Sequence, residues 1–258
     1  MKIVFIGAGN LAVHLSKTLQ NAGFTIAQVY SCTETSAKAL ANVLHVPYIN
    51  DLSRMIVNAS LYIISVKDDA IQSVIHQMPL TDGLILHTAG SVPMNIFFEK
   101  FPNYGVLYPL QTFSKSRLVD FSEIPVFLEA NSHDNLQKLR RIAQSFSHHV
   151  FEASSVDRLK LHLAAVFGCN FVNYLLHCSA EIAKEAGFHF SVLSPLILET
   201  VHKAINSGNP NEVQTGPAIR NDQQVMHQHI DFLESQPEFQ NIYTLLSENI
   251  RKYQSHPV

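Results

Sequence analysis

The chain has 258 residues, of which 47% are hydrophobic and 15% are charged, and its formal net charge is -3. This composition is ordinary for a globular protein and argues against intrinsic disorder. The small net charge and the lack of a basic cluster argue against nucleic-acid or membrane-surface partners. The length predicts one large or two modest domains, each able to bury a core.

Cysteine and histidine usage bears on the compartment and on metals. Cys32, Cys169 and Cys178 form an odd set without zinc-ligand spacing, which is typical of reduced thiols in a cytoplasmic protein. The N-terminus has the residues of a strand instead of a signal peptide, which also predicts a cytoplasmic location. Fourteen histidines raise the question of a metal site, but their spacing does not favour one, and we expect none.

The N-terminal segment carries the strongest motif. Lys2 to Ile6 is an apolar run that predicts a buried strand, and Gly7-Ala8-Gly9-Asn10-Leu11-Ala12 follows it directly at the start of an expected helix. This arrangement matches the G-x-G-x-x-A dinucleotide fingerprint, in which the glycines permit a tight turn and close approach of the pyrophosphate. The helix N-terminus would face the phosphates. We therefore expect residues 7–11 to contact a dinucleotide.

The end of the second expected strand, Thr25 to Tyr30, bears on cofactor choice. NAD-selective sites place an Asp or Glu there, whereas this chain has Ser31. The substitution favours NADP(H), with Cys32 in the same turn and Ser31, Thr33, Ser36 and Lys38 as candidate phosphate donors. The usual nearby Arg is missing, so NAD remains an alternative.

Further strands are expected at 46–49, 61–66, 83–86, 104–110, 125–128 and 149–151, with helices at 35–44, 51–58 and 133–146. The pattern predicts a doubly wound, mostly parallel α/β Rossmann domain over residues 1–153. Ligands bind outside the carboxyl ends of such strands. This rule selects Ser65, Val66, Lys67, Thr88 and Ala89 as cofactor contacts, whereas Asp68 and Asp69 fit simple helix N-terminal residues.

His87 ends one of these strands. It is a candidate catalytic residue, with a structural strand-capping role as the alternative.

From Ser154 the pattern predicts only helices, which defines an all-helical domain at 154–258 for substrate binding or dimerisation. The first helix should run without a breaker to Gly187, and its uncharged stretch from Leu161 to Ala180 is long enough to span a bilayer. At 100° per residue, however, His162, Asn170, Asn173 and His177 fall within an arc of about 80°. We therefore expect a buried helix and no membrane span, with the polar stripe facing either solvent or a cleft.

Later in the chain, Thr215-Gly216-Pro217 precedes Arg220. The segment is either an ordinary helix start with a surface ion pair or a device that directs Arg220 at an anionic substrate.

Several segments together resemble the Rossmann-like NADP oxidoreductases that carry a C-terminal helical domain of unknown function. They are Gly7 to Ala12, Val66 to Ile71, His87 to Gly90, Pro109 to Phe113, Ala164 to Asn170, and Thr215 to Pro217 with Arg220 and Asp222. More distantly the chain is similar to pyrroline-5-carboxylate reductase, ketopantoate reductase and the 6-phosphogluconate dehydrogenase superfamily. The resemblance implies hydride transfer to a small C=O or C=N compound and a homodimer formed through the helical domain.

The chain departs from its relatives at three positions. Tyr108 stands where many relatives have His, and Lys67 replaces a usual Pro. Val166 stands one turn before Asn170, where β-hydroxyacid dehydrogenases of that superfamily have a catalytic Lys, so their chemistry does not transfer directly.

These observations predict an NAD(P)-dependent oxidoreductase of a small molecule, with a non-catalytic nucleotide-binding or sensing protein as the alternative. Either His87 or His162 would exchange the proton that accompanies hydride transfer, because a histidine pKa near neutrality suits that role. Asn170 is a third candidate for the catalytic site, where it would orient the substrate. The remaining candidates for substrate binding are Tyr108, Gln111, Asn173, Thr215 and Arg220.

Overall fold

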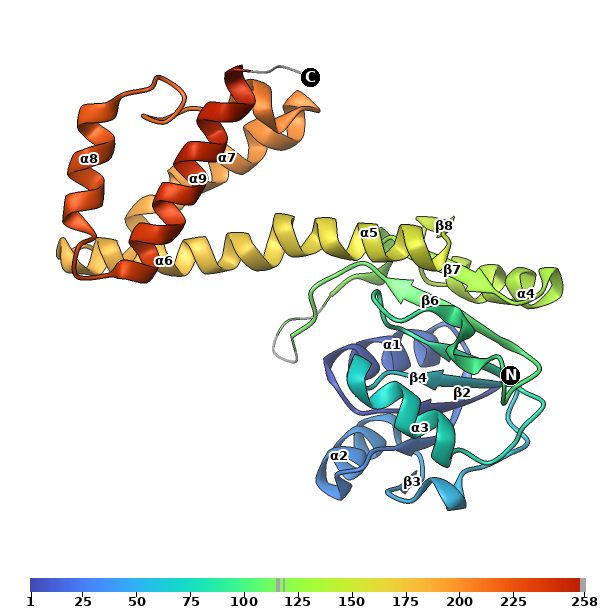
Figure 1. Cartoon of the computed structure of the whole chain (residues 1–258). Coiled ribbons are helices and arrows are strands. Elements are labelled where there is room, and N and C mark those ends of the chain that lie inside the picture. The colour runs from blue at the N-terminus through green and yellow to red at the C-terminus, as the bar shows by residue number, and fades with distance from the viewer. Residues whose placement is uncertain (115–116, 118, 256–258) are drawn as a thin grey trace. The chain divides into compact units, whose positions relative to one another are not determined.

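The computed structural model describes residues 1–114, 117 and 119–255, without the side chains of 253–255. The chain forms two compact units, Met1–Gly168 and Cys169–Val258 (Figure 1). The assignment of cofactor binding to residues 1–153 and of substrate binding or dimerisation to residues 154–258 stays a prediction. The boundary between the two compact units lies at Gly168 and Cys169, inside the long helical run.

The first unit contains an eight-stranded sheet in the order β3-β2-β1-β4-β5-β6-β7-β8. All neighbouring strands are parallel except β6 and β7, which are antiparallel. The order 3-2-1-4-5-6 is that of the doubly wound dinucleotide-binding fold, so the expected fold class is confirmed. The strands are β1 (Lys2–Ile6), β2 (Thr25–Tyr30), β3 (Tyr48–Ile49), β4 (Leu61–Ile64), β5 (Leu84–His87), β6 (Tyr104–Pro109), β7 (Val126–Ala130) and β8 (Val150–Glu152).

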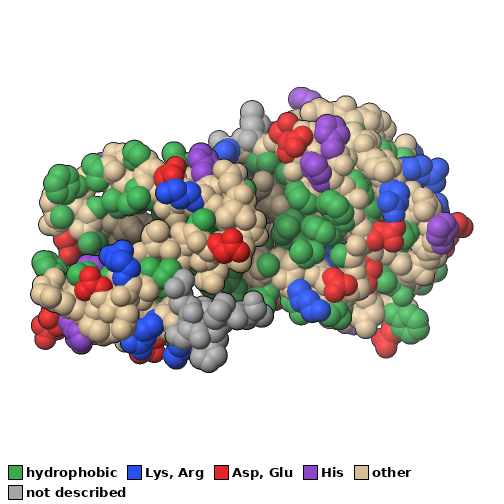
Figure 2. All heavy atoms as spheres, turned by 90° about the horizontal axis from the view of Figure 1, so that it is seen from above, with side chains coloured by type: hydrophobic (Ala, Val, Ile, Leu, Met, Phe, Trp, Pro, Cys, Tyr) green, Lys and Arg blue, Asp and Glu red, His purple; other side chains and the backbone are tan. Residues whose placement is uncertain are grey.

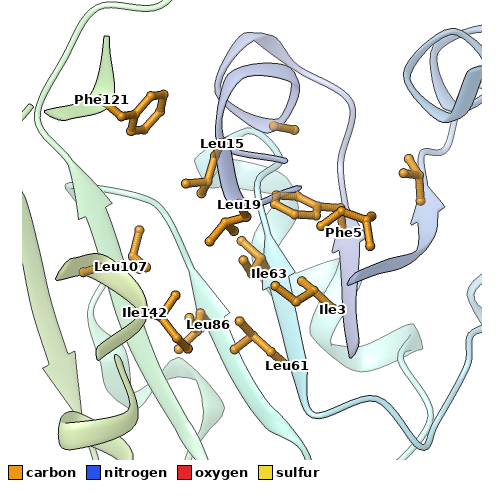
Figure 3. Packing of buried hydrophobic residues seen from close by; sticks show 14 of the residues in the cluster. Ile3, Phe5, Leu15, Leu19, Leu61, Ile63, Leu86, Leu107, Phe121 and Ile142 are labelled. Atoms are coloured by element: carbon orange, nitrogen blue, oxygen red, sulfur yellow. The ribbon is translucent and has the colours of Figure 1, made fainter. Parts of the chain in front are cut away.

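Both faces of the sheet are covered, because successive residues of a strand point to opposite sides. Ile3 and Phe5 of β1 belong to a core that includes Leu15 and Leu19 of α1 (Figure 3), whereas Val4 and Ile6 belong to the core on the other face. This explains why the strands read as continuous apolar runs. The helices of this unit are α1 (Asn10–Asn21), α2 (Glu34–Leu44), α3 (Ile71–Gln77), α4 (His133–Gln144) and α5 (Ser155–Ala165).

The prediction of a helix at residues 51–58 is wrong. Only a short 3-10 turn, Leu52–Arg54, forms there. The side chain of Gln28 accepts a hydrogen bond from the N–H of Ile56, and the hydroxyl of Tyr62 donates to the Ile56 carbonyl. These bonds satisfy the backbone of Ile56 outside a helix. The remaining short 3-10 turns of the first unit are Asp68–Ala70, Met94–Phe97 and Phe121–Glu123.

The long helical run from Ser155 to Glu185 is present, but it is not one regular α-helix. A π-helical segment (η5, Val166–Phe171) separates α5 from α6 (Val172–Glu185), and the run ends before Gly187, whose φ is 79°. The polar arc calculated at a constant 100° per residue is therefore wrong beyond residue 165, because the wider turn changes the helical phase.

Among the described residues, this run is the one helix whose length and mean hydropathy of 1.3 would let it cross a bilayer, and none of its most apolar 18-residue stretch is buried within the chain. The expectation of a buried helix is thus wrong for the single chain. A single helix of this kind is weak evidence for a membrane span.

The second unit contains α6, α7 (Ser194–Ser207), α8 (Gln223–Phe232) and α9 (Pro237–Ser255), with 3-10 turns at Phe190–Leu193 and Pro210–Val213. Of its described hydrophobic residues only four are buried: Cys178, Ala218, Met226 and Leu233. Many others are exposed, among them Leu198, Ile205 and Phe232. Figure 2 shows hydrophobic side chains on the surface of this unit. The unit therefore has a sparse core of its own.

Candidate functional site

A cavity of about 840 Å³ opens at the carboxyl ends of β1, β2, β4 and β5. This volume is within the usual range for ligand sites. All thirteen residues expected to contact the cofactor line it: Gly7, Ala8, Gly9, Asn10, Leu11, Ser31, Cys32, Thr33, Ser65, Val66, Lys67, Thr88 and Ala89. The structure thus gathers residues from four separate strand ends around one hollow.

Gly7 and Gly9, the two glycines of the fingerprint, are required for different steric reasons. Gly7 has a φ of 122°, and a Cβ atom added to it would lie 2.1 Å from the carbonyl oxygen of Ser65. Gly9 has ordinary dihedral angles, and a Cβ atom there would meet no atom within 4 Å. Because Gly9 also lines the cavity and precedes α1, this open space and the first N–H groups of the helix fit a bound phosphate.

The part of the cavity after β2 is lined by the small polar residues Ser31, Cys32, Thr33 and Ser36. Asp68, which follows β4, is the acidic residue among the described lining residues. Glu34 accepts a hydrogen bond from the hydroxyl of Tyr48 and does not line the cavity. Lys38 also lies outside the cavity lining, so the hydroxyl groups are the better candidates for a 2'-phosphate.

His87 lies at the end of β5, fully buried and away from the cavity lining. Its Nδ1 accepts a hydrogen bond from the N–H of Ala89 at 3.2 Å, and its Nε2 has no partner among the residues that the structure describes. The pKa of His87 is lowered to about 3, mainly by burial and also by the positive charge of Arg158, whereas the Pro93 backbone acts in the opposite direction.

The expectation of a near-neutral pKa at His87 is therefore wrong, because removing the ring from water penalises its charged form. His87 is neutral at physiological pH.

His162 has a different setting. It lies half-buried on α5, and its Nδ1 is 3.1 Å from the hydroxyl oxygen of Tyr108. Burial raises the pKa of Tyr108, the charge of Asp68 raises it further, and Arg158 opposes them. The hydroxyl thus keeps its proton at neutral pH, and its hydrogen bond with Nδ1 holds the imidazole in one orientation.

The imidazole of His162 packs on the loop that follows β5. A Cβ atom added to Gly90 would lie 2.9 Å from the Cβ, Cγ and Nδ1 atoms of His162. The neighbouring Thr88 and Ala89 line the cofactor cavity, so His162 lies beside its rim. The pairing of Tyr108 with His162 joins residues 54 apart, and nothing local in the sequence indicates it.

Arg158 is a buried charged residue that was not among the site residues expected from the sequence. This side chain is 1% exposed and forms an ion pair with Glu129 at 2.5 Å. Its one local signal is position, since it lies four residues before His162 on the same helix face.

The other candidates lie elsewhere. Gln111 is exposed, and its side-chain oxygen accepts hydrogen bonds from Thr112. Asn170, Asn173, Thr215 and Arg220 belong to the second unit, so the structure does not gather them with His162 in one compact unit.

In the second unit, Thr215 borders an apolar groove of about 320 Å³. Arg220 is exposed in the turn before α8, whose N-cap is Asp222. Among the described residues there is no cluster of three or more His, Cys, Asp or Glu side chains that could hold a metal ion.

Comparisons of the chain with family models and solved structures identify its family. Residues 2–89 match the family described as NADP oxidoreductase coenzyme F420-dependent, and residues 124–250 match a domain of unknown function, DUF2520. A Bacteroides fragilis protein provisionally assigned as an NADP oxidoreductase is 45% identical, with a TM-score of 0.90 over 97% of this chain and 98% of that one. The chain belongs to this NADP oxidoreductase family. It is accordingly an NAD(P)-dependent oxidoreductase with a nicotinamide dinucleotide as its cofactor.

More distant structures share the fold. An imine reductase from Myxococcus stipitatus in complex with NADP⁺ is 14% identical, with a TM-score of 0.70 over 99% of this chain and 94% of that one. Pyrroline-5-carboxylate reductase from Streptococcus pyogenes is 15% identical, with a TM-score of 0.63 over 98% of each chain. No curated protein sequence matches the chain.

The open space at Gly9 generates the first prediction. Gly9→Ala should leave the free energy of unfolding within about 1 kcal/mol of the wild-type value, because its backbone is unstrained and no atom is displaced. It should weaken nucleotide binding at least about tenfold, because the methyl group occupies the space where a phosphate fits. Isothermal titration calorimetry with NADPH measures the nucleotide affinity, and urea denaturation measures the free energy of unfolding. Gly7→Ala is the contrasting variant and should lose stability directly; equal nucleotide affinity in Gly9→Ala and wild type would contradict the assignment.

The burial of His87 generates a pH prediction. Between pH 6.5 and about 3 the unfolded chain binds a proton that folded His87 does not. The free energy of unfolding should therefore fall with decreasing pH across this window, by up to about 1.4 kcal/mol per pH unit from this group. His87→Asn keeps an acceptor for the Ala89 N–H and does not titrate, so urea denaturation should show a shallower slope. His76→Asn, at an exposed site on α3, should keep the wild-type slope. Parallel slopes for His87→Asn and wild type would refute the effect.

Proposed function

We propose that the protein is an NADP(H)-dependent oxidoreductase that transfers hydride to or from a small C=O or C=N compound. The observation that carries the proposal is the placement of His162, which Tyr108 and Gly90 hold beside the rim of the dinucleotide-sized cavity. A titratable ring at that place can complete the redox step with a proton.

The preference for NADP(H) rests on the end of β2. Hydroxyl groups of Ser31, Thr33 and Ser36 line the cavity there, and the carboxylate in the described lining, that of Asp68, follows β4 and not β2. The distant imine reductase from Myxococcus stipitatus forms a complex with NADP⁺, and its V8 variant forms one with NAD⁺, so the preference rests on the residues at the end of β2.

The chain's own residues have distinct tasks in this proposal. The nicotinamide, when bound, supplies or accepts the hydride. In the reductive direction the doubly protonated ring of His162 would give its Nε2 proton to the substrate oxygen or nitrogen and become neutral, and a proton from water would restore it. In the oxidative direction the neutral ring would take the proton back at Nε2. The Tyr108 hydroxyl holds the ring through Nδ1, which leaves Nε2 as the nitrogen for this exchange. His87 does not take part in this exchange because its low pKa keeps it neutral.

We also propose that the second unit forms a homodimer. Four buried hydrophobic residues are few for a unit of this length, and exposed apolar side chains of α7, such as Leu198 and Ile205, remain uncovered. A second copy of the unit would cover them with surface of the same kind.

The proton role of His162 is tested by turnover. His162→Ala should lower kcat about 100-fold or more, because general acid catalysis contributes that much, and NADPH affinity should stay close to wild type. NADPH oxidation at 340 nm against a panel of imines, keto acids and aldehydes measures the first, and a thermal-shift titration measures the second. At a hundredfold excess over Kd, NADPH should stabilise the protein by about 2.7 kcal/mol. The exposed His148→Ala is the matched control. Unchanged turnover in His162→Ala would eliminate the role, and a thermal shift without turnover on any substrate would favour a sensor.

The dimer is tested by sedimentation. The wild-type chain should sediment as a dimer at micromolar concentration, and Ile205→Glu should dissociate it because a charge would enter the apolar interface. Leu80→Glu, at a comparably exposed position of the first unit, should leave the dimer intact. A wild-type monomer, or recovery of the chain in the membrane fraction, would contradict the proposal.

A further inference from the structure

Arg158 has the largest fully buried side chain among the described residues. Its Nε donates to the carbonyl of Ala89 at 3.2 Å, and its Nη2 donates to the carbonyl of Val92 at 2.5 Å. Its Nη1 donates to Glu129 at 2.5 Å. Each of its three nitrogens therefore has an acceptor, and the planar fork fixes their relative directions.

Ser155 extends this cluster to the beginning of α5. Its N–H and hydroxyl donate to the two carboxylate oxygens of Glu129 at 3.0 and 2.7 Å. The same hydroxyl accepts from the N–H of Met94 at 3.0 Å and from Nη2 of Arg158 at 3.3 Å. The buried charge of Arg158 is thus paired, and the cluster joins three segments: β7, the start of α5 and the loop after β5.

The loop segment held by Arg158 is the one that supports His162. Arg158 donates hydrogen bonds to the carbonyls of Ala89 and Val92, which lie on either side of Gly90 in the chain. The ring of His162 packs on Gly90. Arg158 and His162 are one helical turn apart on the same face of α5. A single side chain therefore fixes both the helix that carries the imidazole and the backbone against which it rests.

We infer that Arg158 is a positioning residue, which acts through His162 by holding its imidazole against Gly90 in line with Tyr108. This inference rests on the proposed proton role of His162. Arg158 itself is buried and does not line the cofactor cavity, so it touches neither substrate nor cofactor through that cavity. Its effect on catalysis would come from geometry, since displacing a reacting group by about 1 Å costs about 100-fold in rate.

The first readout does not use turnover. In the wild-type protein, ¹⁵N spectra should show separate Nδ1 and Nε2 signals for one tautomer of His162, assigned by their loss in His162→Ala. In Arg158→Lys, which keeps the charge but lacks the planar fork, the two signals should move toward each other as the ring exchanges tautomers. Ser155→Ala loosens the same cluster without removing a charge and should have the same effect in smaller measure.

The second readout is a double-mutant cycle on kcat. Arg158→Lys should lower kcat about 10- to 100-fold with KM changed by less than about threefold. In the His162→Ala background the same substitution should cost less than about twofold, because the group through which it acts is gone. Arg140→Lys is the matched control, since Arg140 pairs with Glu152 at an exposed site of the same unit, and it should change neither readout.

Two outcomes would overturn the inference. One is an unaltered His162 tautomer in both Arg158→Lys and Ser155→Ala. The other is an equal loss of kcat from Arg158→Lys in the presence and absence of His162, as a purely structural residue would give. Full turnover in His162→Ala would instead refute the proposed proton role, and the spectra would still show whether Arg158 holds the ring.

Discussion

The backbone of Gly7 passes so close to the carbonyl of Ser65 that no side chain fits between them. Because β1 pairs with β4 in a parallel register, this approach draws the carboxyl ends of the two strands together. The turn after β1 can then lead directly into α1, and the space beyond Gly9 stays open. The cofactor cavity depends on this single steric constraint, since the residues from β2 and β5 only complete its rim.

His87 and His162 show how the surroundings of a histidine decide whether it can exchange a proton. His87 and His162 are the same residue type, and both were reasonable candidates for proton exchange. His87 is enclosed by the sheet and by Phe97, and losing its hydration lowers its pKa to about 3. His162 is only half-buried and has a hydrogen-bond partner in Tyr108. Burial decides between them, and burial is a property of the folded chain.

The two parts of the long helical run differ in how much of their surface packs against the rest of the chain. In α5 the buried Arg158, whose three side-chain nitrogens each donate a hydrogen bond, anchors the helix to the sheet. Beyond the π-helical segment, α6 and the helices after it expose much apolar surface and bury little. A sheet unit with its own cores on both faces can be stable alone, whereas such a helical unit needs further apolar contacts to offset the entropy of ordering its chain.

Local signals in the sequence were enough to predict the sheet unit and the residues that line its cavity. Apolar strand runs, the spacing of Gly7 and Gly9, and the small polar residues at Ser31 to Thr33 are local signals, and strand ends of a parallel sheet converge by topology. Tertiary structure alone decided the rest. The Tyr108–His162 pair spans 54 residues, and the cluster around Arg158 joins a loop, a strand and a helix start. Residues so far apart in the chain meet only through packing, and the π-helical turn that ended the polar stripe leaves no signal in apolar periodicity.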